Sequence, residues 1–248
     1  MRRLILTLPP ILVLACVKPD RPPRNEQEQA DLADTARLVT LRLEMVRSQI
    51  EARGIRDTAV LRAVQTVPRH RFVPEEFAAL AYTDQPLPIG HGQTISQPYI
   101  VAFMAEAADI EHGDRVLEIG TGSGYGAAVL AELAGAVYTI EIIPALAEQA
   151  RQTLKLMRYD SVHVLAGNGW LGWPEHAPYD AVVVTAAPDE IPKALLDQLS
   201  LGGRLVIPVG DRIQTLRVLR KTKDGLREEA SLPVQFVPMV RQPPDTSR

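Results

Sequence analysis

Short apolar runs rich in β-branched residues alternate with helix-like stretches through the second half of the chain. This alternation is typical of a mostly parallel sheet that helices cover on both faces. We therefore predict a doubly wound α/β core, in which a ligand binds at the carboxyl ends of the strands. The predicted strands are RVLEIG (115–120), AVYTIEI (136–142), SVHVLAG (161–167), YDAVVVTAA (179–187) and RLVIPVG (204–210).

Two of the connecting stretches carry an apolar stripe at helical spacing. The first helix is expected to begin at Pro144 and the second to end at the Gly202-Gly203 pair. After Gly210 the helical pattern stops, and segments 216–221 and 232–240 are predicted to be antiparallel strands that close the edge of the sheet. The stripes consist of Leu146, Ala150, Leu154 and Met157, and of Ile191, Leu195 and Leu199.

A helical addition is predicted ahead of this core. One amphipathic helix starts near Leu38 and ends near Gly54, and Asp57 is expected to cap a second helix that runs to Val67. Residues 68–96 hold four prolines and two glycines and read as a long functional loop, ordered by its aromatic side chains. The next helix is expected over 97–108, with Ser96 or Thr94 as its N-cap.

The two ends differ in character from the body. Residues 1–16 combine two arginines, a short apolar run and Cys16, which resembles a bacterial lipoprotein signal; the run is shorter than the roughly 20 residues of a membrane span. An upstream extension on a cytoplasmic enzyme explains the same residues equally well. Residues 17–36 are expected to form a flexible spacer and 241–248 a disordered tail, around one domain over 37–240. Within that domain, the helical addition and substrate loop occupy 37–109 and the core occupies 110–240.

Composition narrows the function classes. Hydrophobic residues make up 46% of the 248 residues and charged residues 23%, which excludes a chain that is disordered throughout. Lys plus Arg is 27 and Asp plus Glu is 30, and the net charge of −3 gives no sign of a nucleic-acid partner. The single cysteine excludes an internal disulfide, and the five histidines lack zinc-site spacing, so no metal is expected.

A glycine-rich loop follows the first predicted strand. Glycines at 120, 122 and 124 allow a sharp turn and a close approach of the backbone to a ligand. Gly122, Gly124 and Ala127 also satisfy the relaxed dinucleotide pattern GxGxxA, so an NAD-binding oxidoreductase is one interpretation.

Two acids separate the interpretations of this loop. Glu118 lies inside the strand end, where a carboxylate would repel a diphosphate but suit a cationic ammonium group. Glu141 ends the second strand, where an acid accepts hydrogen bonds from ribose hydroxyls in nucleotide-binding folds. The structural alternatives are a carboxylate that caps the next helix for Glu118 and a solvated strand end for Glu141.

The third strand ends in Asn168-Gly169-Trp170. An amide here can hydrogen-bond an adenine amine, and an indole can flank the adenine ring. Asn and Gly also favour plain turns, and on these residues alone a turn is the better interpretation.

Four segments resemble the protein-L-isoaspartate O-methyltransferase family. The likeness extends from about residue 45 to 240, and the GQTISQP stretch is its most specific part. It implies a Rossmann-like, seven-stranded, mostly parallel sheet closed by an antiparallel C-terminal hairpin. It also implies methylation by S-adenosyl-L-methionine of the free carboxylate of L-isoaspartyl residues in peptides and damaged proteins. The segments are RHRFVPEEFAALAY (69–82), PLPIGHGQTISQPYIVAFM (86–104), VLEIGTGSGY (116–125) and FVPM (236–239).

The resemblance also implies residue roles. Ser96 would be the catalytic residue and would orient a carboxylate that is already ionised at neutral pH and needs no base. From the residues alone, helix capping is the favoured role of Ser96. Asn168 departs from the family's usual Asp and removes a charge beside the adenine. A cytoplasmic monomer is expected, with an exported lipoprotein anchored through Cys16 as the alternative. Cofactor contacts would come from Glu118, Gly120, Gly122, Ser123, Gly124, Glu141, Asn168, Gly169 and Gln214, and substrate contacts from Tyr82, Thr94 and Ile95.

Three other functions compete with this one. A methyltransferase acting on a small molecule or nucleic acid would share the glycine loop, and basic residues do gather between 212 and 227, although without interleaved aromatics. An NAD-dependent oxidoreductase would need a catalytic His, Lys or Tyr group that is not evident. A cofactor-binding module without catalysis is the third.

Overall fold

The computed structural model describes the backbone of residues 26–242 and the side chains of residues 35–242. The predicted signal with Cys16 and most of the predicted tail lie outside the described residues. The chain divides into one unit up to Leu38 and a second from Val39 onward. Helix α1 spans Glu26–Met45, so the predicted spacer over 17–36 is wrong from Glu26 onward. Glu, Gln, Ala, Leu and Arg dominate this stretch, and their helix propensity outweighs its polar composition.

The end that was predicted near Gly54 is confirmed, whereas the first helix begins at Glu26 and not near Leu38. After α1 the chain continues through η1 (Val46–Ile50) and η2 (Glu51–Arg53) and stops at Gly54, whose φ of 106° is left-handed. Helix α2 (Thr58–Thr66) is capped by Asp57, whose carboxylate accepts the N–H groups of Ala59 and Val60 at 2.7 and 3.2 Å. The cap predicted at Asp57 is therefore confirmed.

The predicted loop over 68–96 contains short elements instead of irregular chain throughout. These are η3 (Arg69–Phe72), η4 (Glu75–Leu80) and an antiparallel hairpin of β1 (Leu87–Gly90) and β2 (Gln93–Ile95). Helix α3 (Pro98–Ala108) follows, and its N-cap is Gln97 without a side-chain hydrogen bond, so the cap predicted for Ser96 or Thr94 is wrong. Proline at the first position has no N–H to be capped, and the Gln97 amide bonds Asp84 instead.

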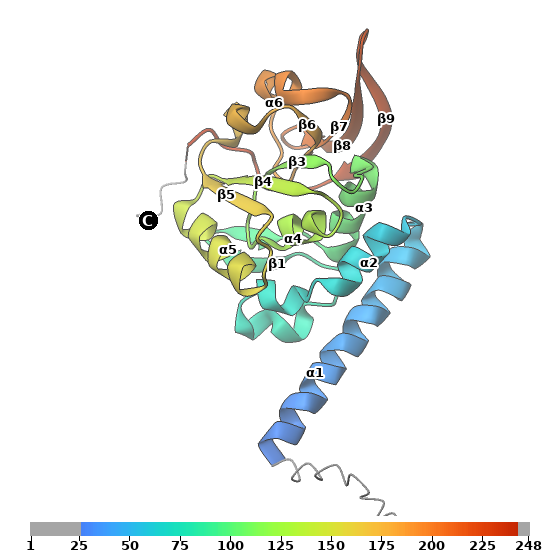
Figure 1. Cartoon of the computed structure of the whole chain (residues 1–248), viewed down its shortest axis with the longest axis vertical. Helices are drawn as coiled ribbons and strands as arrows, with labels where there is room; N and C mark the ends of the chain where they lie inside the picture. The colour runs from blue at the N-terminus through green and yellow to red at the C-terminus, as the bar shows by residue number, and fades with distance from the viewer. Residues whose placement is uncertain (1–25, 243–248) are drawn as a thin grey trace, which may run out of the picture. The chain divides into compact units, whose positions relative to one another are not determined.

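Seven strands form the main sheet in the order β5-β4-β3-β6-β7-β8-β9, which confirms the predicted doubly wound fold (Figure 1). The first five in this order run parallel, whereas β8 and β9 form the antiparallel closing hairpin. Helices α3, α4 and α5 cover one face, and η5 and α6 lie against the other. The strands are β3 (Arg115–Ile119), β4 (Ala136–Glu141), β5 (Val162–Ala166), β6 (Tyr179–Val184), β7 (Leu199–Val209), β8 (Gln214–Thr222) and β9 (Gly225–Val234), and the remaining helices are α4 (Tyr125–Ala131), α5 (Pro144–Leu156), η5 (Gly169–Leu171), η6 (Pro174–His176) and α6 (Lys193–Gln198).

Two predicted boundaries are corrected. Helix α6 ends at Gln198, so Leu199 and the Gly202-Gly203 pair belong to strand β7 and not to a helix and its stop. Leu199 reaches the core from a strand as it would from a helix, and short apolar runs do not distinguish the two. Strand β9 ends at Val234, so residues 235–240 are not part of the closing hairpin.

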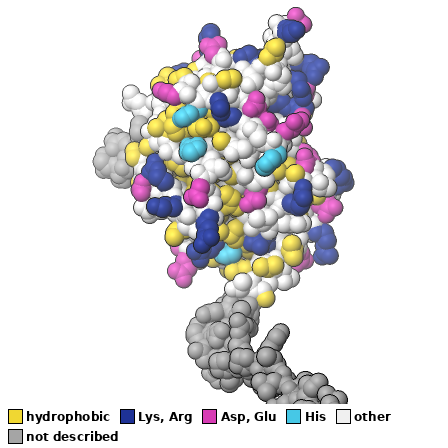
Figure 2. Space-filling model, in the orientation of Figure 1, with side chains coloured by type: hydrophobic (Ala, Val, Ile, Leu, Met, Phe, Trp, Pro, Cys, Tyr) yellow, Lys and Arg dark blue, Asp and Glu magenta, His cyan; other side chains and the backbone are white. Residues whose placement is uncertain are grey.

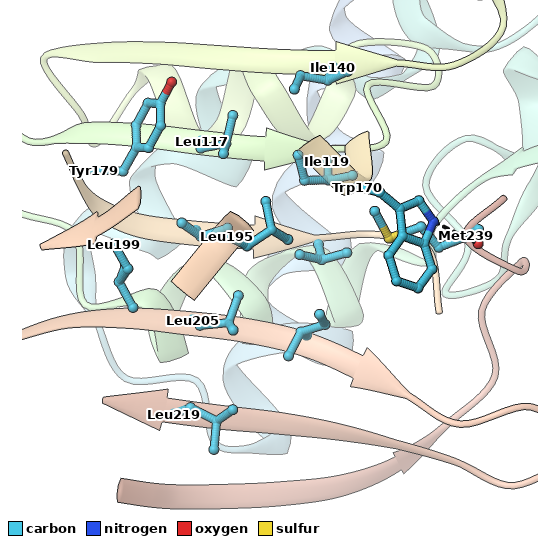
Figure 3. Packing of buried hydrophobic residues seen from close by; sticks show 13 residues of the cluster. Leu117, Ile119, Ile140, Trp170, Tyr179, Leu195, Leu199, Leu205, Leu219 and Met239 are labelled. Carbon is cyan, nitrogen blue, oxygen red and sulfur yellow. Dashed lines mark hydrogen bonds between the residues drawn. The ribbon is translucent and has the colours of Figure 1, made fainter. Parts of the chain in front are cut away.

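Leucine, isoleucine and aromatic side chains fill the layer between the sheet and the elements on its α6 face. Leu117 and Ile119 of β3 point into this cluster, with Trp170 and Met239 at its edge near the strand ends (Figure 3). Because strand side chains alternate, Glu118 lies on the opposite face, toward α3 and α4. The core thus places one acid of the central strand away from the cluster and next to the glycine loop.

The order of the strands brings four loops together. Strand β3 lies between β4 and β6, so the connections that follow β3, β4, β5 and β6 converge at one edge of the sheet. No helix among the described residues is both long and apolar enough to cross a membrane.

Candidate active site

A cavity of about 210 Å³ opens at the carboxyl ends of the central strands. Its walls come from the glycine loop, the end of β4, the end of β6, the β1–β2 hairpin and the segment 235–240, which we call the closing segment. Glu141 is the one charged residue among the described residues that line it, and the rest of the wall is mostly apolar side chain and glycine backbone.

The glycine loop packs tightly against the end of β6. Gly120 has a φ of 98°, and its N–H donates to the Ile140 carbonyl at 2.8 Å. A Cβ at Gly120 would lie 2.3 Å from Thr185 Oγ1, whose hydroxyl donates to the Gly120 carbonyl at 2.8 Å. Only glycine satisfies both the left-handed backbone and this contact.

Glu141 connects the loop to the second strand. Its carboxylate accepts the N–H of Gly122 at 2.8 Å and the N–H of Ile143 at 3.0 Å. Burial raises the pKa of Glu141, and these two N–H groups partly oppose the shift. Each carboxylate oxygen retains capacity for a further hydrogen bond, so Glu141 can also accept from hydroxyl groups in the cavity.

Glu118 is a buried acid on the other side of the loop. Burial raises the pKa of Glu118 to about 8. A hydrogen bond from the Thr139 hydroxyl at 2.6 Å lowers this pKa, and the negative charge of Glu141 raises it further. The Glu118 carboxyl lies against the first turn of α4, where a Cβ on Gly126 would be 2.4 Å from Oε1. A buried acid of this kind favours a cationic neighbour.

A second and larger cavity, which we call the groove, has a volume of about 870 Å³ and lies next to the first. Both cavities are lined by Thr94, Thr185, Val237 and Pro238. A third cavity of about 50 Å³ is lined by Ser96 from the groove side and by Glu118, Gly120 and Ser123 from the glycine loop. Ser96 therefore stands where the groove meets the loop.

Most of the predicted site residues line these cavities. They are Thr94, Ile95, Ser96, Glu118, Gly120, Gly122, Ser123, Glu141 and Gly169.

Three predicted contact residues are engaged elsewhere among the described residues. Gly124 packs against α5, because a Cβ at this position would lie 3.2 Å from the Leu154 side chain. It therefore supports the glycine loop on the side that faces α5. The side-chain Oδ1 of Asn168 accepts the N–H of Trp170 at 2.9 Å, as expected for the plain turn. Tyr82 is buried with its hydroxyl 2.6 Å from Nδ1 of His70 and does not line the groove.

Gln214, predicted as a cofactor contact, is bonded to the closing segment. Its amide pairs with the backbone of Phe236, accepting the N–H at 2.6 Å and donating to the carbonyl at 3.1 Å. The closing segment is held further by Ala187, which donates to the Val237 carbonyl and accepts from the Met239 N–H, each at 2.8 Å. Gln214 thus positions a wall that the first cavity and the groove share.

Sequence reasoning missed Thr185 and the contribution of the closing segment. Thr185 directly follows β6, although the predicted strand over 179–187 included it, and it lines all three cavities. Its place at the carboxyl end of a parallel strand was the available signal, because the ligand site forms there. The closing segment lacks such a signal, since its position depends on Gln214 and Ala187, far away in the chain.

The lining chemistry fits an adenosyl group with a cationic end better than a dinucleotide. No Lys or Arg lines the first cavity among the described residues, and two buried acids flank the loop where a diphosphate would lie. Apolar walls suit a base, Glu141 suits ribose hydroxyls, and Glu118 suits an ammonium group. The fold and this site define a Rossmann-like methyltransferase of the class that uses S-adenosylmethionine.

Comparison with known proteins specifies the family. Residues 41–243 match the model of the protein-L-isoaspartate(D-aspartate) O-methyltransferase family, and the chain belongs to it. The chain is 56% identical over 202 residues to a protein-L-isoaspartate O-methyltransferase of Gloeobacter violaceus, covering 81% of this chain and 98% of that protein. It is also 56% identical over 220 residues to one of Picosynechococcus, covering 89% and 96%.

A solved structure from Plasmodium falciparum agrees with the family. It is a candidate protein-L-isoaspartate O-methyltransferase in complex with S-adenosyl-L-homocysteine, 26% identical, with a TM-score of 0.71. The match covers 81% of this chain and 99% of that one.

The raised pKa of Glu118 predicts a pH-dependent stability of the cofactor-free protein. Between a pH of about 4.5 and about 8 the folded chain keeps this proton and the unfolded chain loses it, so stability falls as pH rises. In this window the unfolding free energy of the wild type should fall by about 1.4 kcal/mol per pH unit more than that of Glu118→Gln. Above a pH of about 8 the unfolding free energies of the two proteins should change in parallel. Urea unfolding at several pH values measures both.

The exposed Glu175→Gln is the matched control and should follow the wild type at every pH. Identical pH dependence of Glu118→Gln and the wild type would contradict the buried, protonated acid.

Proposed function

We propose that this protein transfers the methyl group of S-adenosylmethionine to the free carboxylate of L-isoaspartyl residues in peptides and damaged proteins. The observation that carries the proposal is the position of the segment Thr94–Ser96. It borders both the cavity suited to an adenosyl group and a groove large enough for a stretch of peptide. The family to which the chain belongs supports the same reaction.

The residues of the first and third cavities would hold the cofactor through three kinds of contact. Apolar side chains, including Ile140 and Met239, would pack on the base, and Glu141 would accept hydrogen bonds from the ribose. Glu118 would pair with the ammonium group and lose its proton when that charge arrives. When bound, the cofactor supplies a methyl group that its positive sulfur has already activated.

The chain's own contribution to the reaction is alignment. A substrate carboxylate is ionised at neutral pH, so the protein has no proton to remove from it. The Ser96 hydroxyl would donate a hydrogen bond to one carboxylate oxygen and leave the other directed at the glycine loop. Thr185 and the closing segment would limit water around the reacting atoms, which makes alignment in a confined site the main source of rate enhancement.

The test is methyl transfer from radiolabelled S-adenosylmethionine to two peptides that differ in one linkage. The protein should methylate the isoaspartyl peptide and leave its aspartyl twin almost unlabelled, because only the former presents a carboxylate at the required distance from the backbone. Equal labelling of both peptides, or of neither, would reject the proposed function.

Ser96→Ala should lower kcat for the isoaspartyl peptide at least about tenfold, the lower end for loss of a hydrogen bond to a charged group. Cofactor affinity measured by calorimetry should stay within about twofold, because Ser96 lines the groove and not the first cavity. Ser48→Ala, an exposed serine on η1, is the control and should keep full turnover. An unchanged kcat in Ser96→Ala would remove Ser96 from the mechanism.

Glu141→Gln should weaken cofactor binding about tenfold, since a hydrogen bond to a charged group is worth roughly 1.5–3 kcal/mol and the amide keeps one acceptor. Isothermal titration with S-adenosylhomocysteine measures the affinity, and Glu175→Gln again serves as the control. Wild-type affinity in Glu141→Gln would show that Glu141 only supports the loop.

The nucleic-acid alternative finds little support on the surface. Within the late basic stretch, Arg217 pairs with Glu228, and Arg220 and Arg227 both pair with Glu229. Lys221 donates to two backbone carbonyls. On the face drawn in Figure 2, basic and acidic side chains are interspersed and do not form a field of one sign. A peptide carboxylate remains the acceptor that the site favours.

A further inference from the structure

Among the described residues that line the groove, Arg53 alone carries a charge. It is the last residue of η2, in the helical addition, and its side chain is 45% exposed. The guanidinium carbon lies 3.5 Å from the centre of the Tyr99 ring, so the group is stacked on an aromatic face. This cation is therefore fixed at the wall of the groove.

Asp84 holds the arginine in this position. Its carboxylate pairs with Nη1 of Arg53 and also accepts the N–H of Tyr99 at 3.0 Å and the amide of Gln97 at 3.2 Å. Tyr99 and Gln97 line the groove themselves, directly after Ser96. Asp84 is absent from the lining, so it supports the arginine from behind while the cation faces the groove.

The guanidinium has donors left for a ligand. Arginine carries five N–H bonds in a planar fork, and the bond to Asp84 uses Nη1. Nε and Nη2 contact no acceptor among the side chains and backbone of residues 35–242. A planar fork of this kind is suited to a carboxylate.

The transferred methyl group and Arg53 belong to different parts of the groove. Thr94, Ser96 and Thr185 also line the cavities beside the glycine loop, so the reacting carboxylate must lie near them. Arg53 lines neither of those cavities. The cation thus faces a group of the substrate other than the carboxylate that is methylated.

We propose that Arg53 is a specificity-determining residue that binds an acidic side chain next to the isoaspartyl residue in the substrate peptide. This inference rests on the proposed function and names the peptides that the groove prefers. An exposed ion pair contributes up to about 1 kcal/mol, so the preference should be modest, about threefold in kcat/KM. The preference should shrink between about 0.1 M and about 1 M salt, as the Debye length falls from about 10 Å to about 3 Å.

A peptide series tests the proposal. Each isoaspartyl peptide carries one glutamate, moved along the sequence one position at a time, and each has a twin with glutamine at that position. At one or two positions the wild type should methylate the glutamate peptide about threefold better than its twin. Arg53→Gln should abolish that ratio. The ratio within one variant cancels any loss of folded enzyme.

Two further variants sharpen the result. Arg62→Gln removes an exposed arginine of α2 that does not line the groove, and it should keep the wild-type ratio. Arg53→Lys keeps the charge without the fork and should retain part of the ratio. A ratio of one in the wild type, or an undiminished ratio in Arg53→Gln, would overturn the inference.

Two other outcomes are distinguishable. An equal loss of efficiency for every peptide in Arg53→Gln would also overturn the inference, since it would assign Arg53 to the carboxylate that all substrates share or to the packing of Tyr99. Failure of the wild type to methylate any isoaspartyl peptide would reject the proposed function itself.

Discussion

Two buried carboxylates beside a glycine loop are the constraint on which the site depends. A buried acid is costly unless a cation or hydrogen-bond donors compensate its charge. Glu141 has two backbone N–H donors, whereas Glu118 has one hydroxyl and keeps its proton. No cation among the described residues lines either the cavity beside Glu141 or the cavity beside Glu118. Such a site offers no cation to a diphosphate and suits a ligand that brings its own positive charge.

The wall between cofactor cavity and groove is built from residues far apart in the chain. Thr185 fixes the glycine loop from the end of β6, and Gln214 fixes the closing segment from the start of β8. Neither contact belongs to a regular strand pair. One wall therefore shapes both cavities, so the position of the cofactor and the position of the peptide are coupled through packing.

The helical addition has a function beyond covering the sheet. Asp57 caps α2, and η2 ends at Gly54, which places Arg53 at the groove. The loop that follows α2 returns to the same place through Asp84. In the proposed function, substrate recognition thus combines the addition with the β1–β2 region, while cofactor binding belongs to the core.

Local patterns were enough for strands β3 to β6, the cap at Asp57 and the glycine loop with its two acids, because each depends on spacing within a few residues. Tertiary structure decided which polar side chains face the cavities. Gln214 bonds to Phe236, Tyr82 bonds to His70, and Asp84 holds Arg53 at the groove. A side chain's partner is set by long-range packing, which spacing along the chain does not encode.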